Sequence, residues 1–130
     1  MSEKDLDTIR ASYAALNAGD VQGTLSALHR DAVWRESREL PGGDEFDGRS
    51  AIEEFLEGFL EQWDVFEQHV ESTLRRDDRV LVNIRMRAVG RGSGVEVSAR
   101  YAHVWTLRDG LGAEVDAYYD TEAALRDFEV

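Results

Sequence analysis

The sequence contains no cysteine, and this absence removes several classes of site at once. Without cysteine there is no disulfide framework, no thiolate zinc site and no cysteine nucleophile. No apolar run approaches the ~20 residues that a membrane-spanning helix needs. The charged N-terminus also lacks the apolar region of a signal peptide. The default expectation is therefore a cytoplasmic protein that does not enter a membrane.

Basic residues are also scarce, with 15 Lys and Arg against 27 Asp and Glu, and the formal net charge at pH 7 is −12. A field of that sign repels a phosphate polyanion unless a local basic patch reverses it. The densest basic run, Arg85, Arg87 and Arg91, is too short to do so, and nucleic-acid binding is disfavoured. With 42% hydrophobic and 32% charged residues, residues 1–130 are expected to form a single compact domain.

The start of the chain indicates a helical hairpin. Ser2 with Asp5 resembles a capping box, and the helix behind it is expected to end at Asn17-Ala18-Gly19. Its apolar residues recur at helical spacing: Leu6, Ile9, Tyr13 and Leu16. Asp20 can then cap a short second helix. The apolar stripe of that helix consists of Val21, Leu25 and Leu28.

A short strand and a loop follow the hairpin. Alternation over residues 32–36 places Trp34 and Glu36 on one face of the strand. Residues 37–48 contain the only proline, several glycines and several acids, and they indicate a loop that could cover the mouth of a pocket.

The next segment has the strongest helical pattern in the chain. Ser50 and Glu53 form a second capping box. A full apolar stripe follows at helical spacing: Ile52, Phe55, Leu56, Phe59, Leu60 and Trp63. From Val65 onward the period changes to two, which predicts four strands joined by short turns, and Asp120 is expected to cap a last helix.

This order of elements predicts an α+β fold. Short connections favour antiparallel neighbours, and the helices must cover one face of the sheet. We expect a cone-shaped, strongly curved antiparallel (mixed) sheet, with the N-terminal helical hairpin and one long helix over its concave face. Such a cone is a natural site for a small apolar ligand.

The segment from Arg100 to Asp120 reads as two strands around which the pocket is built. Tyr101, His103 and Trp105 share one face of the first strand, because side chains alternate with a period of two. The matching face of the second strand carries Ala113, Val115, Ala117 and Tyr119. This pattern is typical of a pocket floor with one titratable histidine, and equally of a core with one buried polar residue.

Four segments in this order resemble a SnoaL-like member of the nuclear-transport-factor-like superfamily, which includes ketosteroid isomerases and polyketide cyclases. They are YAALNAGD (13–20), LHRDAVWRES (28–37), FDGRSAIEEFLEGF (46–59) and the ending YAHVWTLRDG…AYYD (101–120). The resemblance covers nearly the whole chain and implies the cone fold. It also implies a homodimer that packs sheet against sheet. It does not imply one activity, because this fold serves many functions.

The resemblance to ketosteroid isomerases implies roles for particular positions. The general base of the first strand corresponds to Glu36, and the protonated acid of a late strand corresponds to His103. The helix-one tyrosine position holds Ser12, with Tyr13 displaced by one residue, or about 100° around a helix.

The remaining acids and histidines fit a site less well. SnoaL-type cyclases place their acid/base aspartate late in the chain, where Asp116 and Asp120 are the available acids, and neither is a good match. By parity Asp116 points away from the pocket, and Asp120 caps a helix. His29 and His69 are expected on the surface. The histidines lack i, i+4 spacing and no clustered acids accompany them, so no metal site is expected. The leading interpretation of the chain also needs no cofactor.

Glu36 and His103 are the candidate catalytic residues. A carboxyl beside the Trp34 indole has its pKa raised by desolvation, toward the range of a useful base, unless it is solvated or paired with an arginine. His103 can exchange a proton or donate to a ligand oxygen, so the two could act as an acid/base or clamp pair. The expected ligand-binding wall consists of Tyr13, Trp34, Phe55, Phe59, Trp63, Ile84, Met86, Tyr101, Trp105, Val115 and Tyr119.

Three functions remain open at this point. The first is acid/base catalysis on a small apolar ligand, of the isomerase, cyclase, dehydratase or hydrolase type. The second is binding of such a ligand without chemistry. The third is a structural dimerisation module whose cavity is only packing.

Overall fold

The computed structural model describes residues 3–38 and 42–130 of the chain. Its elements are α1 (Glu3–Asn17), α2 (Val21–Leu25), β1 (Leu28–Arg35), β2 (Glu45–Asp47), α3 (Arg49–Leu60), β3 (Trp63–Arg76), β4 (Arg79–Gly90), β5 (Glu96–Arg108), β6 (Leu111–Tyr118) and α4 (Thr121–Glu129). None of the described helices is long and apolar enough to cross a membrane.

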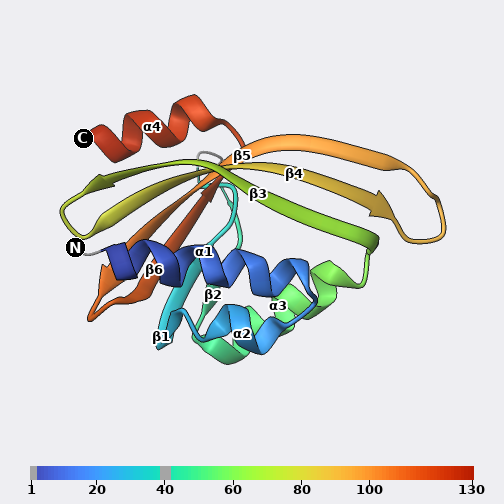
Figure 1. Ribbon diagram of the computed structural model, residues 1–130, viewed down its shortest axis with the longest axis horizontal. Coiled ribbons are helices and arrows are strands. Elements are labelled where there is room, and N and C mark those ends of the chain that lie inside the picture. Colours follow the sequence, from blue (N-terminus) through green and yellow to red (C-terminus); the bar gives the residue numbers. More distant parts are fainter. Residues whose placement is uncertain (1–2, 39–41) are drawn as a thin grey trace.

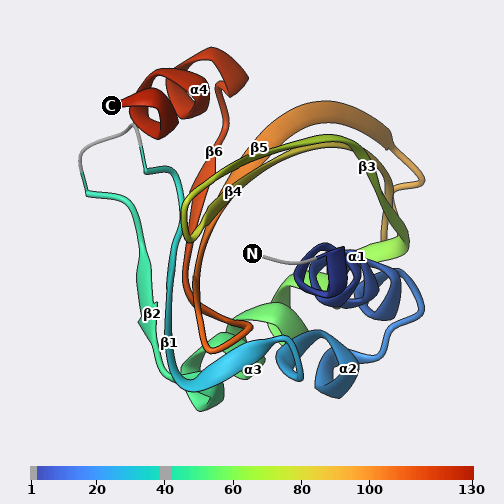
Figure 2. The ribbon, with the colours of Figure 1, turned by 60° about the vertical axis from the view of Figure 1, so that its left-hand side comes forward.

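The six strands form one mixed sheet in the order β2-β1-β6-β5-β4-β3. Neighbouring strands are antiparallel except β1 and β6, which run parallel. Figure 2 shows β3, β4 and β5 arching over α1. The α+β fold with a curved mixed sheet, predicted from the order of elements, is therefore confirmed.

Helices cover both faces of the sheet (Figure 1). Helices α1 and α3 pack on the concave side, where most of the buried apolar residues gather. Helix α4 packs on the convex side against β4, β5 and β6, and forms a second cluster there. This convex cluster consists of Leu81, Ala102, Val104, Tyr118, Ala123, Ala124 and Phe128.

Several predicted helix ends are confirmed. Gly19 follows α1 with a φ of 77°, a left-handed conformation that glycine adopts without strain. The Asp20 carboxylate accepts from the Gly23 N–H and caps α2, and the Asp120 carboxylate accepts from the Glu122 N–H and caps α4. The capping box predicted at Ser2 lies outside the described residues, as does Pro41 of the predicted loop.

The sequence-based boundaries are wrong around β1 and α3. Helix α2 ends at Leu25, so Leu28 begins β1 instead of extending the helical stripe. The predicted loop contains β2, which pairs with β1 through Trp34 opposite Phe46 and extends the sheet by one short strand. A three-residue strand shows no readable alternation, because its pairing partner alone defines it.

Helix α3 also begins and ends earlier than its apolar stripe suggests. Gly48, with a φ of 87°, is the N-cap residue, so Ser50 lies inside the first turn and the predicted capping box is wrong. The Gly48 N–H donates instead to the Ala32 carbonyl of β1. Trp63 begins β3 and reaches the ring of Phe59 from there.

Candidate functional site

A cavity of about 490 Å³ lies between the concave face of the sheet and the helices α1 and α3. This volume falls within the usual range for small-molecule pockets. The described lining residues are Ser12, Tyr13, Leu16, Thr24, Trp34, Glu36, Ser37, Asp44, Phe55, Leu56, Phe59, Phe66, Gln68, Met86, Ala99, Arg100, Tyr101, His103, Trp105, Ala117, Tyr118 and Tyr119.

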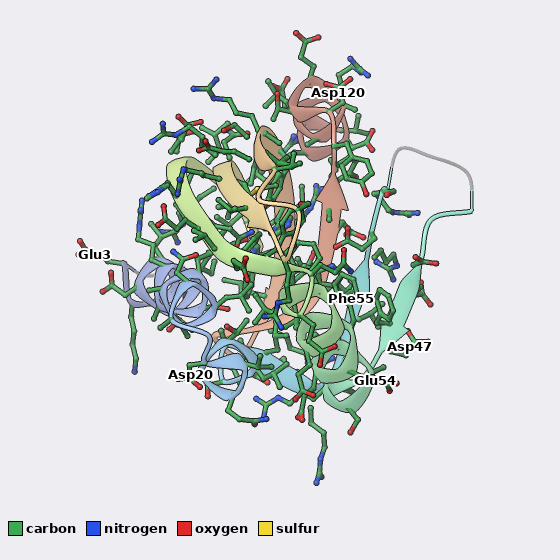
Figure 3. All side chains as sticks on the ribbon, turned by 90° about the vertical axis from the view of Figure 1, so that its right-hand side faces the viewer. Glu3, Asp20, Asp47, Glu54, Phe55 and Asp120 are labelled. Atoms are coloured by element: carbon green, nitrogen blue, oxygen red, sulfur yellow. The ribbon has the colours of Figure 1, made fainter. Side chains whose placement is uncertain are left out.

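Most residues predicted for the site lie along this cavity. These are Glu36, His103, Tyr13, Trp34, Phe55, Phe59, Met86, Tyr101, Trp105 and Tyr119. Tyr119 is 63% exposed, at the end of β6. Figure 3 shows Phe55 leaving α3, and its ring stacks on Phe46 of β2 at a centroid distance of 4.3 Å.

Three residues predicted for the wall lie outside the cavity lining: Trp63, Ile84 and Val115. Val115 lies between Trp34 and Trp105 in strand register, so the two indoles cover its smaller side chain. Ile84 is 1% exposed in the middle strand β4, opposite Tyr101. These three side chains belong to the apolar packing around the cavity and not to its lining.

His103 is 4% exposed and hydrogen-bonds through Nδ1 to the Tyr13 hydroxyl at 2.7 Å. Trp105 Nε1–H donates to the same hydroxyl at 2.9 Å. A tyrosine hydroxyl has one proton to donate. The indole N–H is itself a donor to this hydroxyl, so Nδ1 is the one acceptor among the two partners. Tyr13 therefore donates to Nδ1, and the neutral imidazole carries its proton on Nε2.

The Nε2–H of His103 is available to a ligand. Nε2 has no hydrogen-bond partner within the described residues, and it is not among the enclosed polar atoms. Because His103 lines the cavity, Nε2 opens onto it. Burial lowers the pKa of His103 to about 3, because the charged form would lose its hydration. At neutral pH the imidazole is a neutral hydrogen-bond donor.

The one-residue displacement of Tyr13 does not remove it from the site. Burial raises the pKa of the Tyr13 hydroxyl well above its usual range, and both of its hydrogen bonds go to protein groups. The hydrogen bond from the Tyr13 hydroxyl to Nδ1 orients the His103 ring. Ser12, at the position that the resemblance gives to the tyrosine, donates to the Thr24 carbonyl and joins α1 to α2.

Glu36 follows β1 and faces the cavity beside an indole. Trp34 Nε1–H donates to Glu36 Oε1 at 2.6 Å, and Oε2 stays open to the cavity. Desolvation raises the pKa of Glu36; the Trp34 hydrogen bond opposes this rise and the nearby charge of Asp44 adds to it. The sequence predicted the same direction, a pKa raised by desolvation among aromatic side chains.

The backbone around Glu36 is held in a strained conformation. Ser37 has a φ of 53°, which costs free energy for any residue with a Cβ. Hydrogen bonds hold the chain on both sides, from Glu36 N–H to the Asp44 carbonyl and from Arg38 N–H to the Ala117 carbonyl, each at 2.8 Å. Such over-determined strain is frequent at functional sites.

Gln68 is a cavity residue that the sequence analysis missed. It is 6% exposed, and its Nε2–H donates to the Tyr101 hydroxyl. Its Oε1 is buried and has no hydrogen-bond partner within the described residues. Gln68 shares strand parity with Phe66 and Val70, so an amide on an otherwise apolar face was the available signal.

The other polar candidates lie away from the cavity. Asp116 pairs with Arg35 at 3.1 Å and Arg38 at 3.5 Å, outside the cavity lining as its parity predicts. His69 is an exposed residue beside Glu67. Within residues 3–38 and 42–130, His, Asp and Glu side chains form no group of three suited to a metal ion.

Comparisons with known proteins agree with this architecture. The family model of the SnoaL-like domain matches residues 9–115, whereas a search of curated proteins found no match. The structure of TerC co-crystallized with polyporic acid has a TM-score of 0.79 at 25% identity, and the match covers 98% of this chain and 100% of TerC.

Two further solved structures are similar. Bal32a, from a soil-derived mobile gene cassette, has a TM-score of 0.77 at 25% identity over 94% of each chain. An NTF2-like protein of unknown function from Burkholderia pseudomallei has a TM-score of 0.80 at 22% identity over 97% of each chain. The family model covers most of the sequence, and this chain belongs to the SnoaL-like domain family.

Proposed function

We propose that the protein binds a small, mostly apolar ligand in the cavity and catalyses a proton transfer on it. Glu36 is the base, and His103 donates a hydrogen bond to an oxygen of the ligand. The reaction needs no cofactor and is of the isomerase, cyclase, dehydratase or hydrolase type. One observation carries the proposal: a desolvated carboxyl and a neutral imidazole N–H line the same largely apolar cavity.

The two groups suit different parts of one step. A C–H or O–H bond beside the ligand's acceptor oxygen breaks, and the proton moves to Glu36 while the electron pair moves toward that oxygen. The Nε2–H of His103 stabilises the growing charge, as a fixed donor does in an oxyanion hole. Return of the proton to another atom completes an isomerisation or cyclisation, and loss of a leaving group completes an elimination.

His103 acts as a clamp in this scheme. A histidine whose pKa lies near 3 is neutral at pH 7, so it neither supplies nor takes up the transferred proton. The raised pKa of Glu36 strengthens this carboxylate as a base. Of the two pairings expected from the sequence, acid/base or clamp, the neutral imidazole favours the clamp.

One comparison supports a ligand in the cavity. TerC, at 25% identity and full coverage, was co-crystallized with polyporic acid. Co-crystallization of a similar protein with a small organic compound is consistent with the apolar lining of the cavity in this chain.

Binding without catalysis is the second candidate. Burial keeps Tyr13 and His103 neutral, so neither can exchange protons near neutral pH. A carrier or sensor of a small apolar molecule needs no more than the cavity and its hydrogen-bond donor.

An exchange experiment separates the two candidates. In D₂O, 2-tetralone exchanges its α protons when a base removes them beside the carbonyl, and NMR measures the rate. We expect the wild-type protein to accelerate this exchange. Glu36→Gln should lower the acceleration by about 100-fold or more, the usual worth of a positioned base, and should change the calorimetric Kd by less than about threefold.

Glu54→Gln is the matched control, because Glu54 is an exposed carboxylate on α3 outside the cavity lining. Its exchange rate should equal that of the wild type. Binding of 2-tetralone without accelerated exchange would favour the carrier, and unchanged exchange in Glu36→Gln would remove Glu36 as the base.

The homodimer and the cytoplasmic location, both expected from the sequence, stay predictions. Helix α4 occupies the convex face over β4, β5 and β6. A sheet-to-sheet dimer would therefore use the part of the convex face that α4 leaves open.

A further inference from the structure

A second polar group lies in the cavity beside His103. Tyr101 and His103 occupy alternate positions of β5, and their ring centroids are 5.4 Å apart. Gln68 of β3 reaches the Tyr101 hydroxyl, and β4 lies between the two strands. We call Gln68 and Tyr101 the amide–phenol pair.

The amide–phenol pair has free hydrogen-bond donors and one free acceptor within the described residues. The Tyr101 hydroxyl accepts from Gln68 Nε2–H, and its own proton has no acceptor within the described residues. Gln68 Oε1 is buried without a partner. The second Nε2–H of Gln68 also has no hydrogen-bond partner within the described residues.

Both members of the pair are held in place. The Asn17 side chain, at the end of α1, donates to the Gln68 carbonyl at 2.9 Å and accepts from the Gln68 N–H at 2.8 Å. β3 is an edge strand, so Asn17 satisfies backbone groups that a further strand would otherwise pair. Burial also raises the pKa of Tyr101, which keeps its hydroxyl protonated.

We propose that the amide–phenol pair is a recognition site for a hydroxyl group of the ligand. A hydroxyl oxygen can accept the free proton of Tyr101, and its own proton can be donated to Gln68 Oε1 after a turn of the amide brings that enclosed oxygen to the cavity surface. A carbonyl could use only the donor, and an ammonium group only the acceptor. The inference rests on the proposed function, since it assigns a second contact within the same cavity.

The ligand would therefore carry two separate oxygens on an apolar ring frame. One accepts from His103 Nε2–H, and the other is a hydroxyl that meets the amide–phenol pair. A site built to bond a hydroxyl discriminates against the analogue that lacks it, because its own polar groups are then left unpaired.

Calorimetry with matched ketones tests this site. The probes are 2-tetralone and its 5-, 6-, 7- and 8-hydroxy derivatives, which differ only in the presence and position of a hydroxyl. We expect at least one derivative to bind the wild type about tenfold more tightly than 2-tetralone, the scale of one or two net hydrogen bonds. Tyr101→Phe and Gln68→Met should each reduce this advantage, the ratio of the two Kd values measured in the same variant, below about threefold.

Gln22→Met is the control, because that exposed amide on α2 donates to Glu53 and lies outside the cavity lining. It should keep the full hydroxyl preference. Tyr101→Phe removes a single oxygen, so it gives a result even if Gln68→Met does not fold.

Two outcomes would overturn the hydroxyl site alone: no derivative binds better than 2-tetralone, or the preference survives both substitutions. In either case the proposed function is tested separately, by the binding of 2-tetralone and by its proton exchange through Glu36. If the wild type bound none of the five ketones, both proposals would be overturned.

Discussion

A histidine in an unfolded chain has a pKa near 6.5, whereas burial lowers the pKa of His103 to about 3. The Tyr13 hydroxyl adds to this preference for the neutral form, because it donates to Nδ1 and a protonated Nδ1 could not accept. At the scale of single residues, burial turns a titratable group into a fixed donor.

The pH dependence of stability follows from this shift. Between about pH 6.5 and 3 the unfolded chain binds a proton at His103 and the folded chain does not. The free energy of unfolding therefore falls on acidification, by up to about 1.4 kcal/mol per pH unit. Urea unfolding followed by circular dichroism from pH 7 to 4 should show a shallower loss of stability in His103→Gln.

Glu36 contributes with the opposite sign. Its raised pKa favours the neutral carboxyl in the folded state, so this stability is present at low pH and is lost as pH rises through the folded pKa. Glu36→Gln should therefore lose stability more steeply on acidification than the wild type. Parallel curves for the wild type and both variants would contradict the burial of these two groups.

At the scale of elements, the β5–β6 hairpin holds Trp105 against a glycine. A Cβ built on Gly112 would lie 2.8 Å from Cε3 and Cζ3 of Trp105 and 3.0 Å from Cδ2 of Leu28. The missing Cβ at Gly112 leaves room for the indole, whose Nε1–H donates to Tyr13. The orientation of His103 thus depends on a glycine in a neighbouring strand.

Gly112→Ala tests this dependence. The added methyl group has to displace Trp105 or Leu28, and we expect the free energy of unfolding to fall by about 1–3 kcal/mol, the usual cost of overpacking. Gly58→Ala is the contrast, because a Cβ there meets nothing within 4 Å in helix α3. That variant should gain about 0.5–1 kcal/mol, and equal effects in denaturant unfolding would contradict the packing.

At the scale of the whole molecule, the sheet separates two apolar clusters. The concave cluster surrounds the cavity, and the convex cluster lies under α4. Phe128 of α4 is 4% exposed, and the Arg79 guanidinium lies 5.1 Å from the centre of its ring. Stability and ligand binding can therefore be changed from opposite faces.

Phe128→Ala is expected to lower the free energy of unfolding by about 3 kcal/mol, as removal of a buried aromatic ring usually does. The Kd of 2-tetralone for the folded variant should stay within about twofold of the wild type, because α4 lies across the sheet from the cavity. Chemical denaturation and calorimetry measure the two effects. A large change in Kd would mean that the convex cluster also shapes the cavity.

The sequence by itself determined the features that depend on local periodicity. Alternation predicted that Trp34 of β1 and Glu36, directly after β1, face the same side, and that Tyr101, His103 and Trp105 share one face of β5; all five line the cavity. The spacing of apolar residues predicted α1 and α3, and Asp20 and Asp120 marked the starts of helices. Neighbours in the chain decide these features, so a single sequence carries enough information for them.

The tertiary structure alone decided which faces meet. Parallel pairing of β1 with β6 brings Trp34 beside Val115, and Val115 beside Trp105. The hydrogen bond between Tyr13 and His103 joins residues 90 positions apart, and the unpaired oxygen of Gln68 exists only because the fold encloses it. Local spacing cannot predict such contacts, since they depend on strand order, on the curvature of the sheet and on which larger side chain covers a smaller one.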